Sequence, residues 1–298
     1  MQIRIRQWDP TTLKDGRIVL LVGRRGGGKS TLMTSIMHAL RDRLEFAVAM
    51  TPTEDSMDMF RKHMPESWIH SGFAGTQLED MMKAQRRCSR ERRATKHLGV
   101  FMDDCMYDKK VLKTVSMRDL FMNGRHLRIT FCCAVQYLMD MGPDLRTQCD
   151  YVICTKEMIL SNKMKLWKYF FGMFEKFEDF SNVMDKCTQN YSALVADFTT
   201  PTSSMDSCLF WYRAEQTVDP FRIGSDSFWR LSERCTKSRQ EFEEEAARKE
   251  DEEQEIVHRR AIKKQPTIVR CEDRYGNTVL PGGGEGGGGD ERAKRIEL

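Results

Sequence analysis

The sequence predicts an α/β fold in which a mostly parallel β-sheet is flanked by helices. The main observation is a series of short apolar runs that are bounded by polar residues and separated by stretches with a helical pattern. Such runs are typical of buried parallel strands joined by crossover helices. A second observation is that polar residues suited to chemistry directly follow several of these runs. Ligands bind at this carboxyl edge in open α/β sheets.

The elements follow one another in a regular order. The first apolar run, 17–22, leads directly into a glycine-rich loop, and Lys29–Leu40 then has the pattern of a helix. Mixed helix and loop is expected between 56 and 96. The other strands are predicted at 45–50, 98–102, 127–135 and 151–154, with additional candidates at 191–198 and 208–212 and an edge strand within 1–8.

Changes in composition divide the chain into three parts. The predicted catalytic core extends over 1–235, where the apolar runs lie. Residues 236–264 are highly charged with few apolar positions, so we expect an exposed charged helix there. Residues 265–298 include the sequence PGGGEGGGG, which is typical of a flexible linker.

The overall composition excludes several classes of protein. The 298 residues contain no apolar run of the roughly 18 residues that a spanning helix requires, so no membrane span is predicted. The N-terminus lacks the apolar stretch of a secretory signal, and we expect an intracellular protein that is not secreted. The ten cysteines form no CxxC pair, which favours reduced thiols over a disulfide framework or a zinc site.

Residues 23–30 read GRRGGGKS and lie between a predicted strand and a predicted helix, which is the pattern of a P-loop. Gly23 is expected to allow a sharp turn, and the later glycines let backbone N–H groups approach phosphates. Lys29 is expected to reach the β- and γ-phosphates, Ser30 to ligate Mg²⁺, and Thr31 to lie near the α-phosphate. The predicted nucleotide-binding residues are Gly23, Gly26, Gly27, Gly28, Lys29, Ser30 and Thr31.

Two aspartates follow the predicted strand 98–102. A magnesium nucleotide requires a carboxylate behind the metal, and Asp103 fits this role because it closes an apolar strand. Asp104 is one residue further and is expected to point in another direction, where it would orient or deprotonate the attacking water. With Lys29, this pair predicts a nucleoside triphosphate hydrolase.

Two further candidates lie at opposite ends of the predicted strand 127–135. Gln136 follows the strand and is a candidate γ-phosphate sensor, although a polar residue at this position is also typical of a turn. Arg125 precedes the strand, so we expect it to lie too far from its own nucleotide and to act as an arginine finger in a neighbouring subunit. Arg146 is a second candidate, and an ordinary surface arginine is the alternative for each.

The segment 83–96 is strongly basic. It contains seven Lys or Arg residues and a single Glu, whereas the whole chain has a net charge of only +4. Such a cluster is typical of a surface that contacts nucleic-acid phosphates, and it is equally typical of a solvated helix face.

These motifs together resemble the DNA-packaging ATPases of nucleocytoplasmic large DNA viruses, which belong to the FtsK–HerA superfamily and include the poxvirus packaging ATPase. The resemblance covers about 17–156 and is carried by GRRGGGKSTLM, VFMDDCM and MNGRHLRITFCCAVQYLMDMGPDLRTQCDYVI. It implies a RecA/FtsK–HerA-like P-loop NTPase core with an additional strand, a homo-oligomeric ring of five or six subunits, and translocation of double-stranded DNA into capsids. ATP and Mg²⁺ would be the ligands, capsid proteins would be partners, and the location would be the host cytoplasm, the viral factory or the virion.

The resemblance also implies roles for individual residues. Lys29 and Ser30 would hold the nucleotide and its metal, and Asp103 would be the Walker B aspartate. Asp104 stands where the superfamily often has Glu, and Gln136 would be the sensor glutamine. Arg125 would be the arginine that acts on a neighbouring subunit.

Two other functions are compatible with parts of the sequence. One is a nucleotide or small-molecule kinase, against which the Asp103–Asp104 pair and the lack of an arginine-rich lid argue. The other is a nucleotide-dependent scaffold with weak turnover that recruits a partner through the charged C-terminal helix. Analysis of the phosphorylated product separates the first from a hydrolase, and deletion of 238–298 tests the second.

Overall fold

A computed structural model describes residues 4–105, 110–136, 141–202, 204–216, 218–236, 271–272 and 278–279. The chain forms two compact units, Met1–Lys237 and Ser238–Leu298. In the second unit, the described strands β10 (Cys271–Glu272) and β11 (Thr278–Val279) pair in antiparallel orientation. Apart from these strands, the predicted tail lies outside the described residues, as does the predicted charged helix beyond its first residue.

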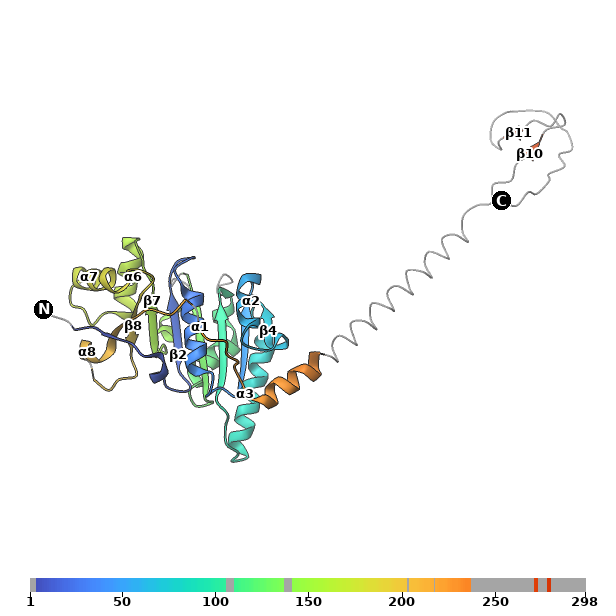
Figure 1. Cartoon of the computed structure of the whole chain (residues 1–298), viewed down its shortest axis with the longest axis horizontal. Helices are drawn as coiled ribbons and strands as arrows, with labels where there is room; N and C mark the ends of the chain where they lie inside the picture. Colours follow the sequence, from blue (N-terminus) through green and yellow to red (C-terminus); the bar gives the residue numbers. More distant parts are fainter. Residues whose placement is uncertain are drawn as a thin grey trace. The chain divides into compact units, whose positions relative to one another are not determined.

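The first unit is built on a nine-stranded sheet with the order β1-β9-β8-β7-β2-β6-β5-β3-β4 (Figure 1). All pairs are parallel except β7 with β8 and β8 with β9. The predicted α/β class with a mostly parallel sheet is confirmed. The strands are β1 (Arg6–Gln7), β2 (Ile18–Val22), β3 (Phe46–Thr51), β4 (Ile69–Ser71), β5 (Leu98–Asp103), β6 (Ile129–Val135), β7 (Tyr151–Cys154), β8 (Ala193–Asp197) and β9 (Leu209–Tyr212).

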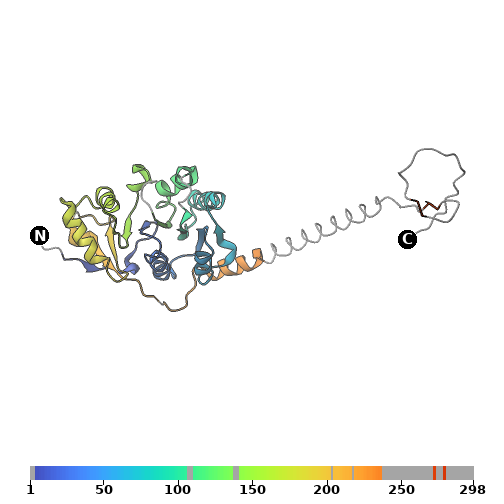
Figure 2. The ribbon, with the colours of Figure 1, turned by 90° about the horizontal axis from the view of Figure 1, so that it is seen from above.

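Helices cover both faces of this sheet (Figure 2). One face packs against α1 and α2, and the other against α3, α4, α6 and α7. Successive side chains of a strand point to opposite faces, so the strand residues alternate between two separate core clusters. In β2, for example, Leu20 belongs to one cluster and Leu21 to the other. Among the described residues, the helices are α1 (Lys29–Leu40), α2 (Glu54–Arg61), α3 (Gly75–Arg90), α4 (Val115–Asn123), α5 (Pro143–Arg146), α6 (Leu160–Phe170), α7 (Phe177–Cys187), α8 (Met205–Cys208) and one at 226–236. Short 3-10 turns lie at Pro10–Thr12, Glu66–Trp68 and Val111–Lys113.

The position of β6 determines where the chemistry lies. Strand β6 is inserted between β2, which leads into the glycine loop, and β5, which ends in Asp103. The register pairs Leu20 of β2 with Cys133 of β6, and Cys133 in turn with Met102 of β5. The three strands are parallel, so their carboxyl ends meet at one edge. The residues that follow β6 therefore lie between the glycine loop and Asp103.

The predicted strands agree with the structure except at their ends and in the omission of β4. Strand β4 was not predicted, because a three-residue strand containing His70 gives a weak pattern. Helices α4, α6 and α7 were not predicted individually, although α7 carries Phe177, Phe180 and Met184 at helical spacing. Two boundaries were also wrong: Cys208 ends helix α8 instead of beginning a strand, and Tyr191 precedes β8 in a turn. The predicted N-terminal edge strand is confirmed as β1, which pairs with β9.

After β9 the chain crosses the face covered by α1 and α2. We call the described residues 213–216 and 218–224 of this crossing the strap (Figure 2). The Ile223 N–H donates to the His63 carbonyl at 2.8 Å, and the Phe221 ring stacks on His63 with ring centroids 3.9 Å apart. The strap then leads to the helix at 226–236, where the Ser232 hydroxyl accepts from the Trp68 indole at 2.8 Å. The contacts with His63 hold the strap against the segment that directly follows α2.

Two histidines are buried in the folded unit, and burial lowers the pKa of both. For His97, the pKa is lowered further by Arg43 and Arg128 and raised by Asp15, which lies 3.3 Å from Nδ1. The unfolded chain therefore binds protons at these histidines, near pH ~6.5, more readily than the folded chain. Folding stability is expected to be complete above that pH and to fall as pH decreases through it.

This pH dependence is measurable as a melting temperature that is lower at pH 5.5 than at pH 7.5. Each kcal/mol lost at the histidines lowers the melting temperature of a domain of this size by about 2–4 °C. A His97→Gln variant should show a flatter dependence, because glutamine does not titrate. A melting temperature that rises on acidification would contradict the assignment of neutral, buried histidines.

Within the described residues, no helix is both long enough and apolar enough to cross a membrane. The nine cysteines whose side chains the structure describes are all free, as predicted. Burial raises the pKa of most of them, to about 12 for Cys105 and Cys149. Thiols of this kind stay protonated at neutral pH and are poor nucleophiles. They act as small apolar residues in the core.

Candidate nucleotide site

The glycine loop joins the end of β2 to the start of α1. Gly26 and Gly28 adopt positive φ angles of 71° and 87°, which residues with a Cβ rarely adopt, and a Cβ at Gly26 would meet nothing within 4 Å. Gly28 is the N-cap of α1, and no side chain caps this helix. The first N–H groups of α1 therefore remain available for an anion. The loop has the shape and the free donors that a phosphate chain requires.

Thr155 explains why Gly23 and Gly27 are glycines. A Cβ on Gly23 would lie 1.8 Å from Thr155 Oγ1, and a Cβ on Gly27 would lie 2.9 Å from the same atom. Thr155 is buried, directly follows β7, and donates its N–H to the Val22 carbonyl at 2.9 Å. We predicted Gly23 for its ability to turn, but the structure gives close packing as the reason. A threonine after a strand resembles a turn residue, so no sequence signal pointed to Thr155.

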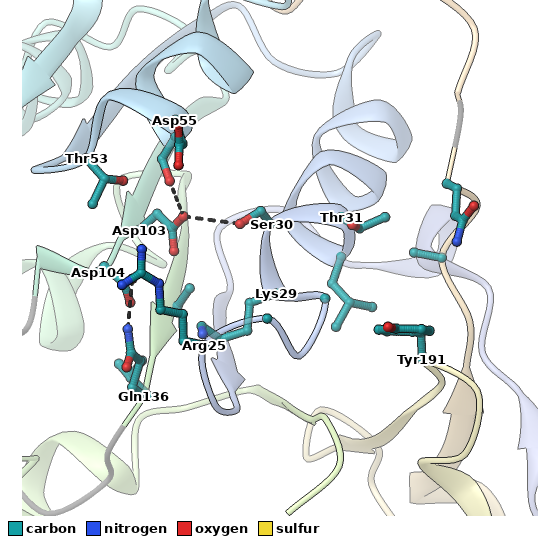
Figure 3. Close-up of a pocket in the computed structure, with 18 of the residues that line it drawn as sticks. Arg25, Lys29, Ser30, Thr31, Thr53, Asp55, Asp103, Asp104, Gln136 and Tyr191 are labelled. Carbon is teal, nitrogen blue, oxygen red and sulfur yellow. Dashed lines mark hydrogen bonds between the residues drawn. The ribbon is translucent and has the colours of Figure 1, made fainter.

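Lys29 and Arg25 of the loop lie beside the expected phosphate position. Lys29 is 6% exposed, and its Nζ donates to the Arg24 carbonyl at 3.1 Å. Arg25 lines the cavity, and its side chain lies between Lys29 and Asp104 (Figure 3). Two cations thus face the place where a triphosphate would carry most of its charge. Arg25 occupies a variable position of the P-loop pattern and was not predicted.

Ser30, Ser56 and Asp103 form a group of oxygen atoms beside the loop. Asp103 Oδ2 accepts from the Ser56 hydroxyl at 2.8 Å and lies 3.5 Å from the Ser30 hydroxyl (Figure 3). Burial raises the pKa of Asp103 and the charge of Asp104 raises it further, whereas the bond from Ser56 and the charge of Lys29 lower it. Ser56 was missed because it lies in α2, far from the recognised motifs.

This oxygen group fits Mg²⁺. Serine and aspartate provide the hard oxygen ligands that Mg²⁺ prefers, and in nucleotide sites the remaining ligands come from phosphates and water. Among the described residues, no group of three or more His, Cys, Asp or Glu side chains is arranged to hold a metal ion by itself. Ser30 and Asp103 therefore form a partial site of the kind that is completed by a bound nucleotide.

Asp104 and Gln136 form a direct pair. Asp104 leaves β5 with a φ of 52°, which turns its side chain away from that of Asp103. The Gln136 side-chain amide donates to Asp104 Oδ2 at 2.9 Å, on the same side of the glycine loop as Asp103 (Figure 3). The inserted strand β6 produces this contact, because Gln136 follows it directly. The structure thus brings both predicted strand-end residues to one place.

Most of these residues line one cavity of about 1240 Å³. Its acidic end contains Asp103, Asp104 and Gln136, and its other end contains Tyr191 and the strap (Figure 3). The volume exceeds the roughly 300–1,000 Å³ typical of small-molecule sites, so a nucleotide fits with room for water. Of the residues predicted to bind nucleotide or metal, Gly26, Gly28, Lys29, Ser30, Thr31 and Asp103 line the cavity, whereas Gly23 and Gly27 lie behind it against Thr155.

The two candidate arginines lie elsewhere. Arg125 is exposed, and its backbone lies beside Gly16 at the amino edge of the sheet, as expected. Arg146 of α5 lies over the Tyr169 ring, 3.8 Å from the centroid, and donates to the Met141 carbonyl at 2.9 Å. Arg146 is thus held by its own chain, and Arg125 is the freer of the two.

The basic segment 83–96 lies at the carboxyl end of α3 and in the loop that leads into β5. It is therefore near the amino edge of the sheet, away from the cavity, and α3 projects beyond the sheet there (Figure 1). Several of its charges are neutralised by local ion pairs, such as that of Arg86 with Asp119 at 2.6 Å. Within the described part of the chain, the basic side chains of this segment without an acidic partner are those of Arg87, Arg90 and Arg92.

Comparison with known proteins identifies viral relatives, although no family model matches the chain. The uncharacterized protein 015R of Frog virus 3 is 30% identical over 230 residues, which are 76% of this chain and 70% of that protein. Protein 088R of Invertebrate iridescent virus 3 is 29% identical over 212 residues, 70% of this chain and 81% of that protein. Protein L437 of Acanthamoeba polyphaga mimivirus is 27% identical over 219 residues, 70% of this chain and 76% of that protein. The predicted relationship to proteins of nucleocytoplasmic large DNA viruses is confirmed.

Solved structures of lower similarity were also found. The genome packaging NTPase B204 from Sulfolobus turreted icosahedral virus 2, in complex with sulfate, has a TM-score of 0.48 and 16% identity and covers 69% of this chain and 100% of its own. EssC (ATPases 2 and 3) from Geobacillus thermodenitrificans has a TM-score of 0.46 and 13% identity and covers 76% of this chain and 45% of its own. Because these identities and TM-scores are low, we argue the role of each residue from the geometry of the site and not from these structures.

Proposed function

The chain belongs to the protein family of large DNA viruses that includes protein 015R of Frog virus 3, and on this premise we propose that it is an ATP hydrolase that moves double-stranded DNA. The proposal rests on the hydrogen bond between Gln136 and Asp104, which lie in the same cavity as the phosphate-binding loop. A site that only binds nucleotide does not require a second carboxylate held beside the terminal phosphate by an amide.

Different residues of the site bind the phosphates, hold the metal ion and align the attacking water. Backbone N–H groups of the loop and the start of α1 hold the phosphates, and Lys29 neutralises their charge. Ser30 and Asp103 would hold Mg²⁺, which draws charge from the phosphates when it is bound. Asp104 accepts a hydrogen bond from the attacking water and aligns it with the γ-phosphate. Gln136 holds Asp104 in that orientation.

Charge that develops on the γ-phosphate would be stabilised from a second subunit. Arg125 lies at the edge of the sheet opposite to the cavity of its own chain, so it is placed to act only on a neighbour. In a closed homo-oligomeric ring, every subunit would supply Arg125 to the next one. The ring itself follows from the resemblance of the motifs, and an oligomeric mass is its direct test.

Double-stranded DNA is the proposed cargo, with capsids as its destination. Three arginines of the basic segment, Arg87, Arg90 and Arg92, have no acidic partner among the described residues, and they are the proposed phosphate-binding side chains. Contacts between arginines and phosphates release counterions, so DNA binding through these side chains would weaken as salt increases.

The decisive experiment measures the ATPase rate with and without double-stranded DNA, alongside the oligomeric mass. We expect the rate to rise with DNA, and we expect that rise to shrink between about 50 and about 200 mM salt. A chain that hydrolyses ATP at one rate whatever the DNA concentration, and that stays monomeric under those conditions, would contradict DNA translocation.

Variants at the basic segment locate the DNA-binding surface. If each of Arg87, Arg90 and Arg92 binds one phosphate, replacing all three with Ala should reduce the log–log salt slope of DNA binding by about 0.9 per arginine. The matched control replaces Arg86 and Arg93, which are paired with Asp119 and Glu91, and should change the slope less. If the triple and the double variant have equal salt slopes, the basic segment is a solvent-exposed helix face that does not bind DNA.

A further inference from the structure

The geometry of the loop sets a direction for a bound nucleotide. The γ-phosphate end lies beside Asp104 and Gln136, and the α-phosphate is placed near Thr31 at the other side of the loop. The ribose and base of the nucleotide must then continue past Thr31, away from the acidic residues. Figure 3 shows which side chain lies in that direction: Tyr191, across the loop from Asp103 and Asp104.

Tyr191 is presented to this space in an uncommon way. Its side chain lines the cavity and is 70% exposed, and its Cδ1 lies 3.9 Å from where a Cβ on Gly28 would be. Both Asn190 and Tyr191 have positive φ angles, 52° and 61°, in the turn before β8. Asparagine adopts this conformation readily, whereas tyrosine does so rarely. A large exposed ring held in this conformation beside a ligand cavity indicates a functional constraint.

The strap forms the other wall at this end of the cavity. Arg213, Ala214 and Gln216 line it directly after β9. The strap is anchored further along by Ile223 and Phe221 on His63. A flat aromatic ring on one side and a guanidinium with an amide on the other are the groups that bind a planar heteroaromatic ring.

We infer that Tyr191 stacks on the base of the bound nucleotide and that Arg213 and Gln216 of the strap close the same subsite. This inference rests on the proposed function, because the phosphate loop defines where the base lies. Stacking uses the π-face that every base has, so the subsite strengthens binding with little discrimination between bases. Adenine and guanine nucleotides should therefore lose affinity together when the ring is removed.

The test compares a ligand with a base and one without. Binding of ATP, GTP and inorganic tripolyphosphate, each with Mg²⁺, is measured by calorimetry on the full chain and on Tyr191→Ala. We expect the variant to bind ATP and GTP about 5-fold to 100-fold more weakly, and to bind tripolyphosphate as the unaltered chain does. Tyr191→Phe keeps the ring and should keep both affinities.

A third variant separates stacking from backbone strain. Tyr191→Asn removes the ring and suits the positive φ, so it should fold at least as stably as the unaltered chain and still lose affinity for ATP. Unchanged ATP affinity in Tyr191→Ala and Tyr191→Asn, with tripolyphosphate still bound, would overturn the stacking role and leave the phosphate site intact. Failure of all three ligands to bind the unaltered chain would overturn the proposed function instead.

Discussion

Replacing Asp104 with Asn is expected to lower the rate of ATP hydrolysis by about 100-fold to 10,000-fold, the usual contribution of a positioned acid or base. The amide retains the size of the carboxylate but cannot take up a proton. Nucleotide affinity should change little, because Lys29, Ser30 and Asp103 are untouched. The measurement is a steady-state rate of phosphate release together with an equilibrium titration of ATP.

The matched control for this variant is Asp55→Asn. Asp55 is an exposed carboxylate that lines the same cavity, so its replacement removes one negative charge from the site without touching Gln136. This control should retain most of the rate. Hydrolysis at the unaltered rate in Asp104→Asn would remove Asp104 from the mechanism, and transfer of phosphate to an acceptor other than water would favour the kinase alternative.

Replacing Gly23 with Ala is expected to destabilise the domain by about 3 kcal/mol, the upper part of the range for overpacking, and to abolish nucleotide binding. The new Cβ would lie 1.8 Å from Thr155 Oγ1, so either β7 or the glycine loop must move. Because the same displacement distorts the phosphate cradle, stability and ATP affinity should fall together. Denaturant titration and calorimetry measure the two effects.

A double variant tests whether Thr155 is the cause. Thr155→Ala removes Oγ1, and the closest remaining approach to the new methyl group is then 3.1 Å, from the Thr155 Cβ. Adding Thr155→Ala to Gly23→Ala should therefore recover a large part of the stability. Gly26→Ala is the control within the loop, because its Cβ meets nothing and only its φ of 71° opposes it. If the double variant is no more stable than Gly23→Ala alone, another contact accounts for the destabilisation.

The sequence predicts the strands and the ends of strands well in this chain, for a physical reason. Buried parallel strands must be apolar throughout, and a polar residue that follows one can lie only at the edge of the sheet. Asp103, Asp104 and Gln136 were predicted to lie at the ligand-binding edge on this basis, and the structure places them together there. Helix α1 was predicted with its observed bounds, because its apolar positions recur at helical spacing after the loop.

Apart from Arg25, the site residues that the sequence did not predict come from parts of the chain outside the recognised motifs. Ser56 lies in α2 and Thr155 follows β7, and neither position has a local pattern that marks it. Tyr191 was assigned to a strand, because aromatic residues favour strands and the positive φ angles of its turn leave no trace in an Asn-Tyr sequence. The pairing of Arg86 with Asp119 likewise depends on the packing of α3 on α4. Contacts between elements far apart in sequence decide the positions of Ser56, Thr155 and Arg86, and local backbone geometry decides that of Tyr191.

Strand β6 links two distant points of the molecule. Its seven residues are all buried and are hydrogen-bonded to β2 on one side and β5 on the other, so the strand can be neither stretched nor bent at low cost. Arg125 lies just before its start, and Gln136 follows its end. A single buried strand therefore connects the turn that carries Arg125 to the residue that contacts Asp104.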